Sequence, residues 1–586
     1  MNFLRRQPAP KRLQSSQIHR LLTAFLFLAS LALRLAAVSV PITTDEAKWL
    51  ERGLAFGKHL ISGTWADTYQ WHHPGVPLMW LNAAGGGLHW GLGRLGVLPE
   101  VSPSLMQYWD SFPLQTDLPL SLYCVSRVLQ AVVTSIGMVL LFDQARRLLG
   151  GAIALVGIVI LSLEPFFLGY QRLLLTDVLQ TQCLTLSVLL LLRALAGTGR
   201  RRALLGSGVA LGLAASTKIT TLSVLPAIAL WLVCIERGQW RPQFLPQGWR
   251  SQRKTLTTWL GTALMTGFAI WPALWVSPLG TINQLIEGLK EETERGEFFY
   301  WGQTVDSIGA SFYPVVLLYR LTPLLLLGLS VALVGLVGLT VPRLRQRLPQ
   351  VPAQVPALVA LLLVAVCMLA VLSLSDNKLD RYILPTIPAL AWLAAAGWLQ
   401  LWEWLRIWRR RRQGGKLTSL ASGAIALLVV LHLVALGHHA PYFLTYFNPL
   451  LGGPKAAQQV LMVGNGEGLD QAAVWLNRQE NAAALTVGSW YPAAFAPYFQ
   501  GKTVGIRRSL EADHLVLDYL VLYVNQLQRQ LPSAQALRGV MRDPPLHVVW
   551  LHGVEYIRIY PGLDPQASRD FRSEPVRKLD FAGRSH

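Results

Sequence analysis

Charged residues are scarce in this chain, and so are cysteines. Only 14% of its 586 residues are Asp, Glu, Lys or Arg, whereas 52% are hydrophobic, and the mean hydropathy is +0.38. Soluble globular domains carry charge on about a quarter of their residues, so this composition excludes that class and indicates a polytopic membrane protein. The cysteines lie in or beside apolar runs without metal-ligand spacing, which disfavours disulfides and a cysteine-bound metal. They are Cys124, Cys183, Cys234 and Cys367.

Acidic residues are the scarcer charged type. The chain has 32 Asp and Glu against 52 Lys and Arg, which gives a formal net charge of +20. Such an excess is typical of nucleic-acid binding, but here the basic residues cluster beside apolar runs, where they set membrane topology. The sequence therefore predicts a membrane protein and no nucleic-acid partner.

Long apolar runs are what the sequence has in abundance. A helix needs about 20 apolar residues to cross about 30 Å of hydrocarbon. The chain contains about eleven such spans if residues 203–236 form a hairpin broken at Ser216, Thr217 and Lys218. The fold class is then mainly α, a polytopic membrane helix bundle. The other predicted spans are 21–40, 122–142, 151–169, 174–195, 256–277, 313–341, 353–374, 382–402 and 418–437.

Clusters of basic residues orient these spans. They occupy the amino terminus and alternate connections, as the positive-inside rule requires of a cytoplasmic face. We therefore expect a multi-pass protein of the cytoplasmic membrane with a cytoplasmic amino terminus, whose first apolar segment is retained because no signal cleavage site follows it. The clusters are Arg5, Arg6, Lys11 and Arg12; Arg146 and Arg147; Arg200, Arg201 and Arg202; Arg250, Arg253 and Lys254; Arg343, Arg345 and Arg347; and Arg409–Arg412.

Three regions then face outward, namely residues 41–120, residues 278–312 and everything after about 440. The apolar segment that begins near residue 76 is predicted to lie in the interface, because a crossing there would move every later basic cluster outside. Residues 441–586 mix strand-like runs such as ALTVGSW and LHVVWLHG with helix-like runs, which predicts a small extracytoplasmic α/β domain after a transmembrane domain at 1–440. Within it, GNGEG at 464–468 lacks dinucleotide-binding spacing and is interpreted as a turn.

An acidic pair, Asp45 and Glu46, follows the first span on the outer side. One interpretation is a helix start capped by Thr44, where negative charge suits the helix dipole; the other is the reacting end of a membrane enzyme. Asp177 begins the fourth span, also on the outer side, five residues after Arg172. A carboxylate facing hydrocarbon is costly, so we expect Asp177 to enter a polar cavity or to pair with a cation. A structural pair with Arg172 is one interpretation.

Cations gather at the outer helix ends, where the positive-inside rule disfavours them. Each alone could snorkel to lipid phosphates or anchor a helix end. Together they indicate a bound anion, for which a lipid phosphate is the natural candidate in a membrane cavity. These cations are Arg127, Lys218, and Lys378 with Arg381 in the turn SDNKLDRYILP.

The first outer region also contains the sequence TYQWHHPGVP. Adjacent histidines point in different directions on most backbones, so His72 and His73 alone do not predict a metal site. A turn rich in aromatic residues, including Tyr69 and Trp71, is suited to lining a site for sugar rings. In the second region, a run of charges is interpreted as a solvated helix face. The run consists of Glu291, Glu292, Glu294, Arg295 and Glu297.

Taken in order, these motifs resemble the polyprenyl-phosphate-sugar-dependent glycosyltransferases of GT-C architecture. The resemblance is greatest to glycosyltransferase family 39, which includes protein O-mannosyltransferases and bacterial aminoarabinose transferases. It covers roughly the first 400 residues. The matching features are the DE pair, Arg127 before a span that ends in Arg146 and Arg147, TD at 176–177, STK at 216–218 and KLDRYILPTIPAL from 378.

The resemblance implies transfer of a sugar, with inversion, from a polyprenyl-phosphate donor to an acceptor hydroxyl at the outer face. It implies Asp45 as general base, Glu46 orienting acceptor or base, and Asp177 assisting, with no required cofactor or metal because the donor is already activated. The implied donor-phosphate ligands are Lys218, Lys378, Arg381, Arg172 and Arg127. The residues implied to line the acceptor or sugar site are His72, His73, Trp71 and Tyr69.

Departures from the family pattern leave the acceptor open among glycan, lipid and protein. Some relatives carry an acidic residue and a lysine before a double proline where this chain has HHPGVP, and no long inserted luminal domain is present, so protein mannosylation is not implied. A transporter or flippase of a lipid-linked or anionic solute is the alternative, and a nonenzymatic scaffold is a third hypothesis. Charged residues at outer helix ends, rather than near the bilayer midplane, favour the enzyme.

Overall fold

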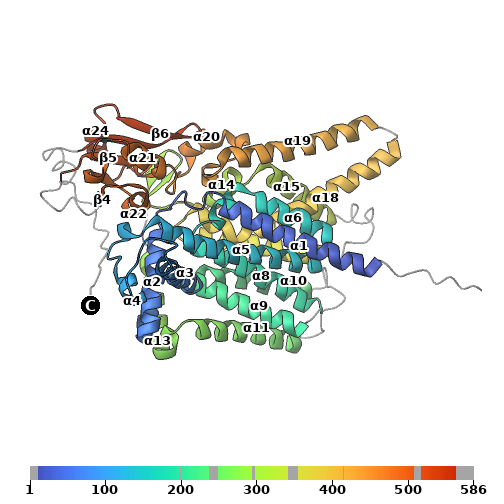
Figure 1. The fold of residues 1–586 in the computed structure, drawn as a ribbon. Coiled ribbons are helices and arrows are strands. Elements are labelled where there is room, and N and C mark those ends of the chain that lie inside the picture. Colours follow the sequence, from blue (N-terminus) through green and yellow to red (C-terminus); the bar gives the residue numbers. More distant parts are fainter. Residues whose placement is uncertain are drawn as a thin grey trace, which may run out of the picture.

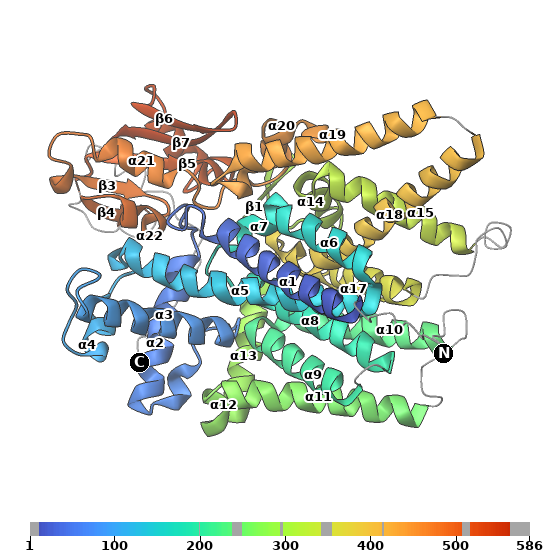
Figure 2. The ribbon, with the colours of Figure 1, turned by 45° about the vertical axis from the view of Figure 1, so that its right-hand side comes forward.

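A computed structural model describes residues 11–197, 200–236, 249–293, 297–340, 354–412, 415–506 and 516–562. Long helices run side by side through most of it, and a small sheet lies at one end (Figures 1 and 2). Among the described residues, five helices are long and apolar enough to cross a membrane, or seven if each of two bent pairs is one span. The multi-pass helical class is confirmed, whereas the expected eleven spans are not.

The five spanning helices coincide with predicted apolar runs. Four of these five helices contain no 3-10 turn. Among those four, α8 has the largest share of buried residues, because α9 and α5 pack against it. The five are residues Gln17–Leu35 of α1 (Lys11–Leu35), α5 (Leu120–Leu149), α8 (Thr176–Leu195), α17 (Val355–Ser373), and Asp380–Trp408, which comprises η4 (Asp380–Thr386) and most of α18 (Ile387–Arg412).

Two of the predicted spans are broken, so the expectation of unbroken helices at 151–169 and 313–341 is wrong. A proline follows each break, Pro165 in one and Pro323 in the other, because proline is accepted in a first helical turn but not within a helix. Two hydrogen bonds join the two breaks. The buried Glu164 carboxylate accepts them from the Thr322 backbone N–H (3.1 Å) and hydroxyl (2.7 Å). The pieces are α6 (Gly151–Leu163), α7 (Pro165–Gln171), α14 (Phe312–Arg320) and α15 (Pro323–Thr340).

The hairpin predicted at 203–236 is confirmed, with its break where expected. Helix α9 (Arg200–Thr217) ends at Thr217, Lys218 is extended, and the turn η3 (Ile219–Ser223) leads into α10 (Val224–Glu236). Two further long helices run along the bundle, α11 (Trp249–Ile270) beside α9 and α19 (Gly415–His439) along one side (Figure 1).

Helices of the first and second outer regions lie at the end of the bundle nearest the sheet. Helices α2 and α13 run across the direction of the long helices (Figure 1). Helix α3 packs against α2 and α5 and is not among the helices apolar enough to span, in keeping with the interfacial placement. The bounds of these elements are α2 (Glu46–Ser62), η1 (Trp65–Thr68), α3 (Val76–Arg94), α4 (Leu105–Asp110), η2 (Gln115–Asp117), α12 (Ala273–Val276) and α13 (Pro278–Thr293).

The carboxy-terminal part forms a five-stranded mixed sheet of order β4-β3-β5-β7-β6. Strand β3 pairs in parallel with β4 and β5, whereas β7 pairs antiparallel with β5 and β6. The runs ALTVGSW and LHVVWLHG form β3 and β6, as predicted. The strands are β3 (Thr486–Ser489), β4 (Lys502–Gly505), β5 (Tyr519–Tyr523), β6 (His547–Leu551) and β7 (Val554–Pro561).

Short helices and turns complete this part of the chain, and one hydrophobic core runs from the membrane helices into the sheet. The hairpin of β1 (Phe298–Tyr300) and β2 (Gln303–Val305) contacts it through a bridge between Tyr300 and Leu461. The remaining elements are η5 (Phe443–Thr445), η6 (Pro449–Leu451), α20 (Gly453–Val460), α21 (Leu469–Leu476), η7 (Ala482–Ala484), α22 (Pro492–Phe495), η8 (Ala496–Tyr498), α23 (Val524–Gln528) and α24 (Ala534–Val540).

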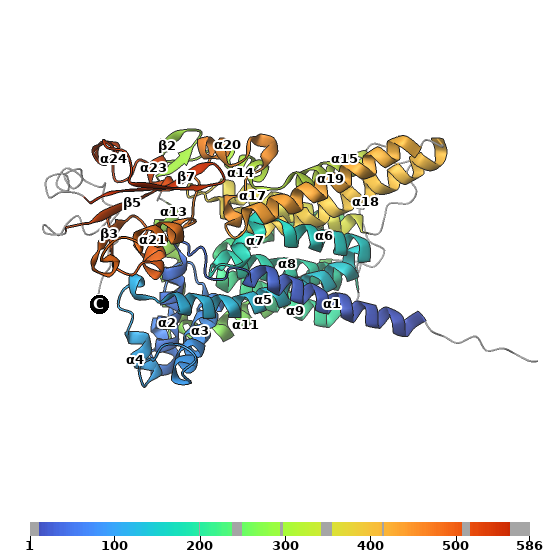
Figure 3. The same ribbon diagram turned by 45° about the horizontal axis from the view of Figure 1, so that its top comes forward.

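The two ends of the bundle differ. The start of α1, the end of α18 and the start of α19 lie at one end, and the sheet lies at the other (Figures 1 and 3). Which end faces the cytoplasm stays a prediction. Several residues of the predicted charge clusters lie outside the described residues, namely Arg5, Arg6, Glu294, Arg295, Arg343, Arg345 and Arg347.

Close packing of α15 on α18 yields a stability prediction. A Cβ on Gly397 would lie 2.0 Å from the Gly328 carbonyl oxygen, so Gly397→Ala forces the helices apart, at a cost of about 1–3 kcal/mol for an overpacked core. Thermal unfolding in detergent should start at a lower temperature. Gly338→Ala is the control, because no atom lies within 4 Å of that Cβ. Equal unfolding temperatures for the two variants would contradict the packing.

Candidate active site

Asp45 lies at the junction between the first span and α2, and two cations hold its carboxylate. One oxygen accepts a hydrogen bond from the Lys48 ammonium at 3.0 Å, and the other accepts one from the Arg381 guanidinium at 2.7 Å. The side chain is 23% exposed. Asp45, not Thr44, is the N-cap residue of α2, and its side chain makes no capping bond. The helix-cap interpretation of Asp45 is therefore wrong in its details, because the carboxylate points to cations.

Asp177, in the first turn of α8, belongs to the same group of charges. The Lys218 ammonium donates to one Asp177 oxygen at 2.7 Å, and the Arg381 Nε lies 3.7 Å from the other. Lys218 also lies 3.9 Å from the centre of the Tyr382 ring. Arg381 thus bridges Asp45 and Asp177, and Asp177 pairs with Lys218 rather than with Arg172, the other interpretation that the sequence left open. We call Asp45, Asp177, Lys218 and Arg381 the charge cluster.

Local structure explains how distant residues reach this cluster. Asp177 begins α8, where negative charge is favoured by the helix dipole. Lys218 is placed by the break between α9 and η3, and Arg381 by η4, which precedes α18. The Gly75 N–H donates to the Thr217 carbonyl at 3.0 Å, which ties the HHPG turn to the break at Lys218.

Glu46 and Arg127 form a second, fully buried ion pair. The Arg127 Nη2 donates to Glu46 at 2.5 Å, and the two side chains are 2% and 0% exposed. Glu46 also accepts from the Thr43 N–H and hydroxyl and from the Leu174 N–H, at 2.9, 3.0 and 2.9 Å. Arg127 donates further to the Val38 and Pro41 carbonyls. The expected roles of Glu46 at the acceptor and of Arg127 at the phosphate do not fit this geometry, because each group is enclosed by its partners.

Two other predicted phosphate ligands also bind backbone carbonyls. Arg172 donates to the carbonyls of Pro441, Ala36 and Ala37, and it holds the end of α1 against the segment after α19. Lys378 is 3% exposed and donates to the carbonyls of Ile308 and Ser375. No contact joins either side chain to the charge cluster among the described residues, so their assignment to the phosphate site is corrected to a structural one.

The predicted aromatic lining has specific neighbours. Tyr69 stacks on Trp271, and Trp71 lies under the Arg52 guanidinium at 4.2 Å. His72 is buried between Trp71 and His73, and a Cβ on Gly288 of α13 would lie 2.4 Å from its Cβ. The turn is therefore packed between α2 and α13, close to the charge cluster through Gly75. Contacts of Tyr69, Trp71, His72 and His73 with an acceptor or sugar stay a prediction.

Sequence reasoning missed three contributors to the site. Lys48 is one helical turn after Asp45 in DEAK, a spacing that could have been noticed. Arg320, which is buried, and Asp380, which is partly exposed and precedes Arg381 in the chain, form an ion pair at 2.5 Å, with the centre of the Phe447 ring 3.9 Å from the guanidinium. The approach of Asn465 to Thr44, at 3.1 Å, had no sequence signal because 421 positions separate them.

Electrostatics at Asp45 favour the ionised form. Burial by itself raises the pKa of this carboxyl, but the Lys48 ammonium and the Arg381 guanidinium together hold the pKa well below its usual range. A carboxylate with so low a pKa is a weak base. Asp45 can therefore accept a proton efficiently only when at least one cation moves away.

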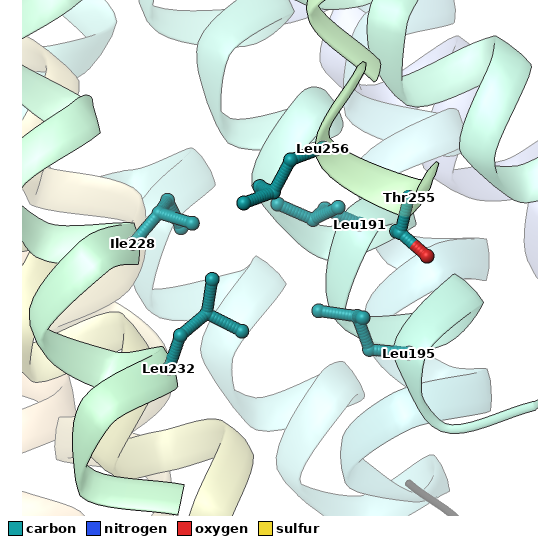
Figure 4. Close-up of a pocket in the computed structure, with 6 residues that line it drawn as sticks. All are labelled: Leu191, Leu195, Ile228, Leu232, Thr255 and Leu256. Carbon is teal, nitrogen blue, oxygen red and sulfur yellow. The ribbon is translucent and has the colours of Figure 1, made fainter. Parts of the chain in front are cut away.

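An apolar pocket between α8, α10 and α11 lies apart from this chemistry (Figure 4). Thr255 supplies its one polar side chain, and none of its lining residues is titratable; they are Leu191, Leu195, Ile228, Leu232, Thr255 and Leu256. Within the described ranges, no three His, Cys, Asp or Glu residues are grouped so that they could hold a metal ion.

Comparison with known families supports the resemblance. Residues 121–247 match the family model described as dolichyl-phosphate-mannose-protein mannosyltransferase. The chain resembles family 39. The matched segment contains Arg127, Asp177 and Lys218, two of which belong to the charge cluster. No curated protein matches the whole sequence significantly.

Three solved structures match this chain loosely. ArnT from Cupriavidus metallidurans, bound to undecaprenyl phosphate, is 13% identical with a TM-score of 0.45, over 94% of this chain and 98% of that one. The S. cerevisiae Pmt1-Pmt2 complex bound to the sugar donor is 20% identical with a TM-score of 0.31, over 51% and 37%. AglB from Archaeoglobus fulgidus is 11% identical with a TM-score of 0.44, over 89% and 71%. At these scores the similarity is loose.

The buried ion pair yields a prediction about folding. Arg127→Met leaves the Glu46 carboxylate buried without its cation, which costs about 3–5 kcal/mol for such a pair. We expect much lower thermal stability in detergent by fluorescence-detected size exclusion. Glu46→Gln combined with Arg127→Met should recover part of it. A stable Arg127→Met protein that has lost donor binding would instead support the assignment of Arg127 as a ligand of the donor phosphate.

Proposed function

We propose that this protein is an integral membrane glycosyltransferase that moves a sugar from a polyprenyl-phosphate donor to an acceptor hydroxyl at the outer face of the cytoplasmic membrane. The observation that carries the proposal is the charge cluster, where the partly exposed Asp45 is linked through Arg381 to the buried pair of Asp177 and Lys218. The family-model match over residues 121–247 supports the same chemistry. The amino terminus is then cytoplasmic, and the sheet lies outside the cytoplasm.

The donor phosphate is held by Arg381 and Lys218. Within the charge cluster, the two positive charges are neutralised by the two carboxylates. A phosphate that enters must therefore replace a carboxylate at one of the cations. Asp45 is the one that can be replaced, because Asp177 is 3% exposed and Asp45 is 23% exposed. The planar guanidinium of Arg381 has five N–H donors, enough to keep Asp177 while it binds phosphate oxygens.

Release from Arg381 turns Asp45 into the base. With that cation occupied by phosphate, the pKa of the Asp45 carboxyl rises towards the range where it accepts a proton from the acceptor hydroxyl. The acceptor oxygen then bonds to the anomeric carbon on the face opposite the phosphate, while the bond from that carbon to the phosphate oxygen breaks. The lipid phosphate leaves with the electron pair, its added charge is stabilised by Arg381 and Lys218, and the anomeric configuration inverts.

Other residues support this step from a distance. Asp177 positions Lys218 and Arg381, while Glu46 and Arg127 position the start of α2. Tyr69, Trp71, His72 and His73 lie on the turn tied to Lys218 through Gly75, which suits them to the sugar or acceptor. A glycan or lipid of the cell envelope is the proposed acceptor. The proposed division is a transmembrane domain at 1–440 and an extracytoplasmic part at 441–586.

The proposal predicts that Asp45→Asn abolishes transfer. The amide is nearly isosteric but cannot take the acceptor proton, so we expect a loss of at least 100-fold in kcat, within the range typical of a general base. The measurement uses purified protein in liposomes with labelled polyprenyl-phosphate sugars and membrane extract. Glu51→Gln is the matched control on the same helix, because its carboxylate binds the Gln115 amide instead of the cluster.

Two results separate the possible outcomes of this experiment. Binding of polyprenyl phosphate to Asp45→Asn should persist, because Lys218 and Arg381 remain. Wild-type transfer by a folded Asp45→Asn protein would rule out the base. An equal loss of transfer in Glu51→Gln would show that the effect is not specific to Asp45, which would also contradict the proposal.

A second prediction concerns pH. Because Lys48 and Arg381 lower the pKa of Asp45, the wild-type carboxylate stays ionised as the pH falls, and kcat/KM should show no acidic limb from this group down to about pH 4, near its ordinary pKa. Removal of a cation raises that pKa, so the limb should appear at higher pH than in wild type in both Lys48→Gln and Arg381→Gln. Lys58→Gln, whose ammonium binds Asp110, is the control. Identical profiles for all four proteins would refute the assignment.

A further inference from the structure

The GNGEG loop, residues 464–468, is pressed against the segment that leads into Asp45. Gly464, Gly466 and Gly468 have φ values of 91°, 112° and 84°, a conformation that glycine adopts without strain. A Cβ on Gly466 would lie 2.1 Å from the Ile42 carbonyl oxygen. The turn expected from the sequence is thus present, and its glycines allow backbone to approach backbone.

The carboxy-terminal part holds this loop rigidly. The Glu467 carboxylate, 1% exposed, accepts from the Asn465 N–H at 2.5 Å and from the Tyr523 hydroxyl at 3.1 Å. The Tyr523 hydroxyl in turn accepts from the Gly466 N–H at 2.8 Å, and the Asn525 amide donates to the Gly464 carbonyl at 2.9 Å. Two of the loop's N–H groups are therefore occupied within the protein, which argues against an anion-binding cradle.

Two side chains of the carboxy-terminal part bind the segment 39–44 directly. The Thr44 hydroxyl donates to the Asn465 side-chain oxygen at 3.1 Å. The Tyr498 hydroxyl, at the end of η8, donates to the Ser39 carbonyl at 2.5 Å and accepts from the Ile42 N–H at 3.0 Å. These contacts bind Ser39, Ile42 and Thr44, three of the six residues that precede Asp45.

We infer that the carboxy-terminal part is a positioning element of the active site, which acts on Asp45 through Tyr498 and Asn465. Asp45 must meet Arg381 at 2.7 Å and then reach an acceptor proton, and a shift of about 1 Å can cost about 100-fold in rate. Thr44 is the neighbour of Asp45 in the chain, so its bond to Asn465 limits that shift. This inference rests on the proposed function, because it assigns Asp45 the role of base.

The experiment compares Tyr498→Phe, Thr44→Val and Thr44→Ser with wild type in the reconstituted transfer assay. Loss of the orienting hydrogen bonds, two in Tyr498→Phe and one in Thr44→Val, should lower kcat about tenfold, equivalent to about 1.4 kcal/mol, while KM for the donor stays unchanged. Thr44→Ser keeps the hydroxyl and should retain wild-type kcat. Because a displaced Asp45 loses contact with Arg381, the acidic limb of kcat/KM should also move to higher pH in the two impaired variants.

Tyr442→Phe is the matched control, since its hydroxyl donates to Asp470 and accepts from the Gln471 amide, both within the carboxy-terminal part. It should keep wild-type kcat. The inference is overturned if Tyr498→Phe and Thr44→Val keep wild-type kcat and pH profiles, or if Tyr442→Phe is impaired as much as they are. Asp45→Asn is measured alongside: if it is inactive while these variants are normal, only this inference fails, whereas an active Asp45→Asn removes the proposed function as well.

Discussion

The buried Glu46 carboxylate is the interaction on which the rest of the site depends. It accepts hydrogen bonds from Arg127 on α5, from Thr43 just before α2 and from Leu174 just before α8. A single side chain therefore sets the distance between the segment that carries Asp45 and the segment that carries Asp177. Because a buried carboxylate without such donors is costly, the three segments cannot separate without a large loss of stability. The spacing of the charge cluster follows from this constraint.

The charge cluster and the neighbouring Lys48 alternate in sign. The order runs from Lys48 through Asp45, Arg381 and Asp177 to Lys218. Such an arrangement is stable in a poorly solvated site because each charge has an opposite neighbour. In the proposed mechanism, an incoming phosphate competes with Asp45 for Arg381. This competition links the activation of Asp45 to donor binding.

The membrane helices and the sheet meet at the segment before Asp45. Glu46 and Arg127 bind this segment from the helix bundle, whereas Tyr498 and Asn465 bind it from the carboxy-terminal part. A shared hydrophobic core accompanies these polar contacts. One glycine, Gly466, allows the close approach of the loop to the Ile42 carbonyl. The sheet is thus joined to the site by the chain segment that carries the proposed base.

Composition and hydropathy alone determined that this is a helical membrane protein with a small sheet near its carboxy terminus, because transfer of apolar helices into lipid depends mainly on local sequence. The order of the DE, TD, STK and KLDRY motifs also sufficed to group Asp45, Asp177, Lys218 and Arg381. Only the tertiary structure separated these from Glu46, Arg127, Arg172 and Lys378, which have the same charges but bind buried partners or backbone carbonyls. Helix breaks at Glu164 and Thr322 and the contact of Asn465 with Thr44 likewise depended on packing between distant segments. Partner choice for a charged side chain is a property of three-dimensional proximity, which spacing along the chain does not encode.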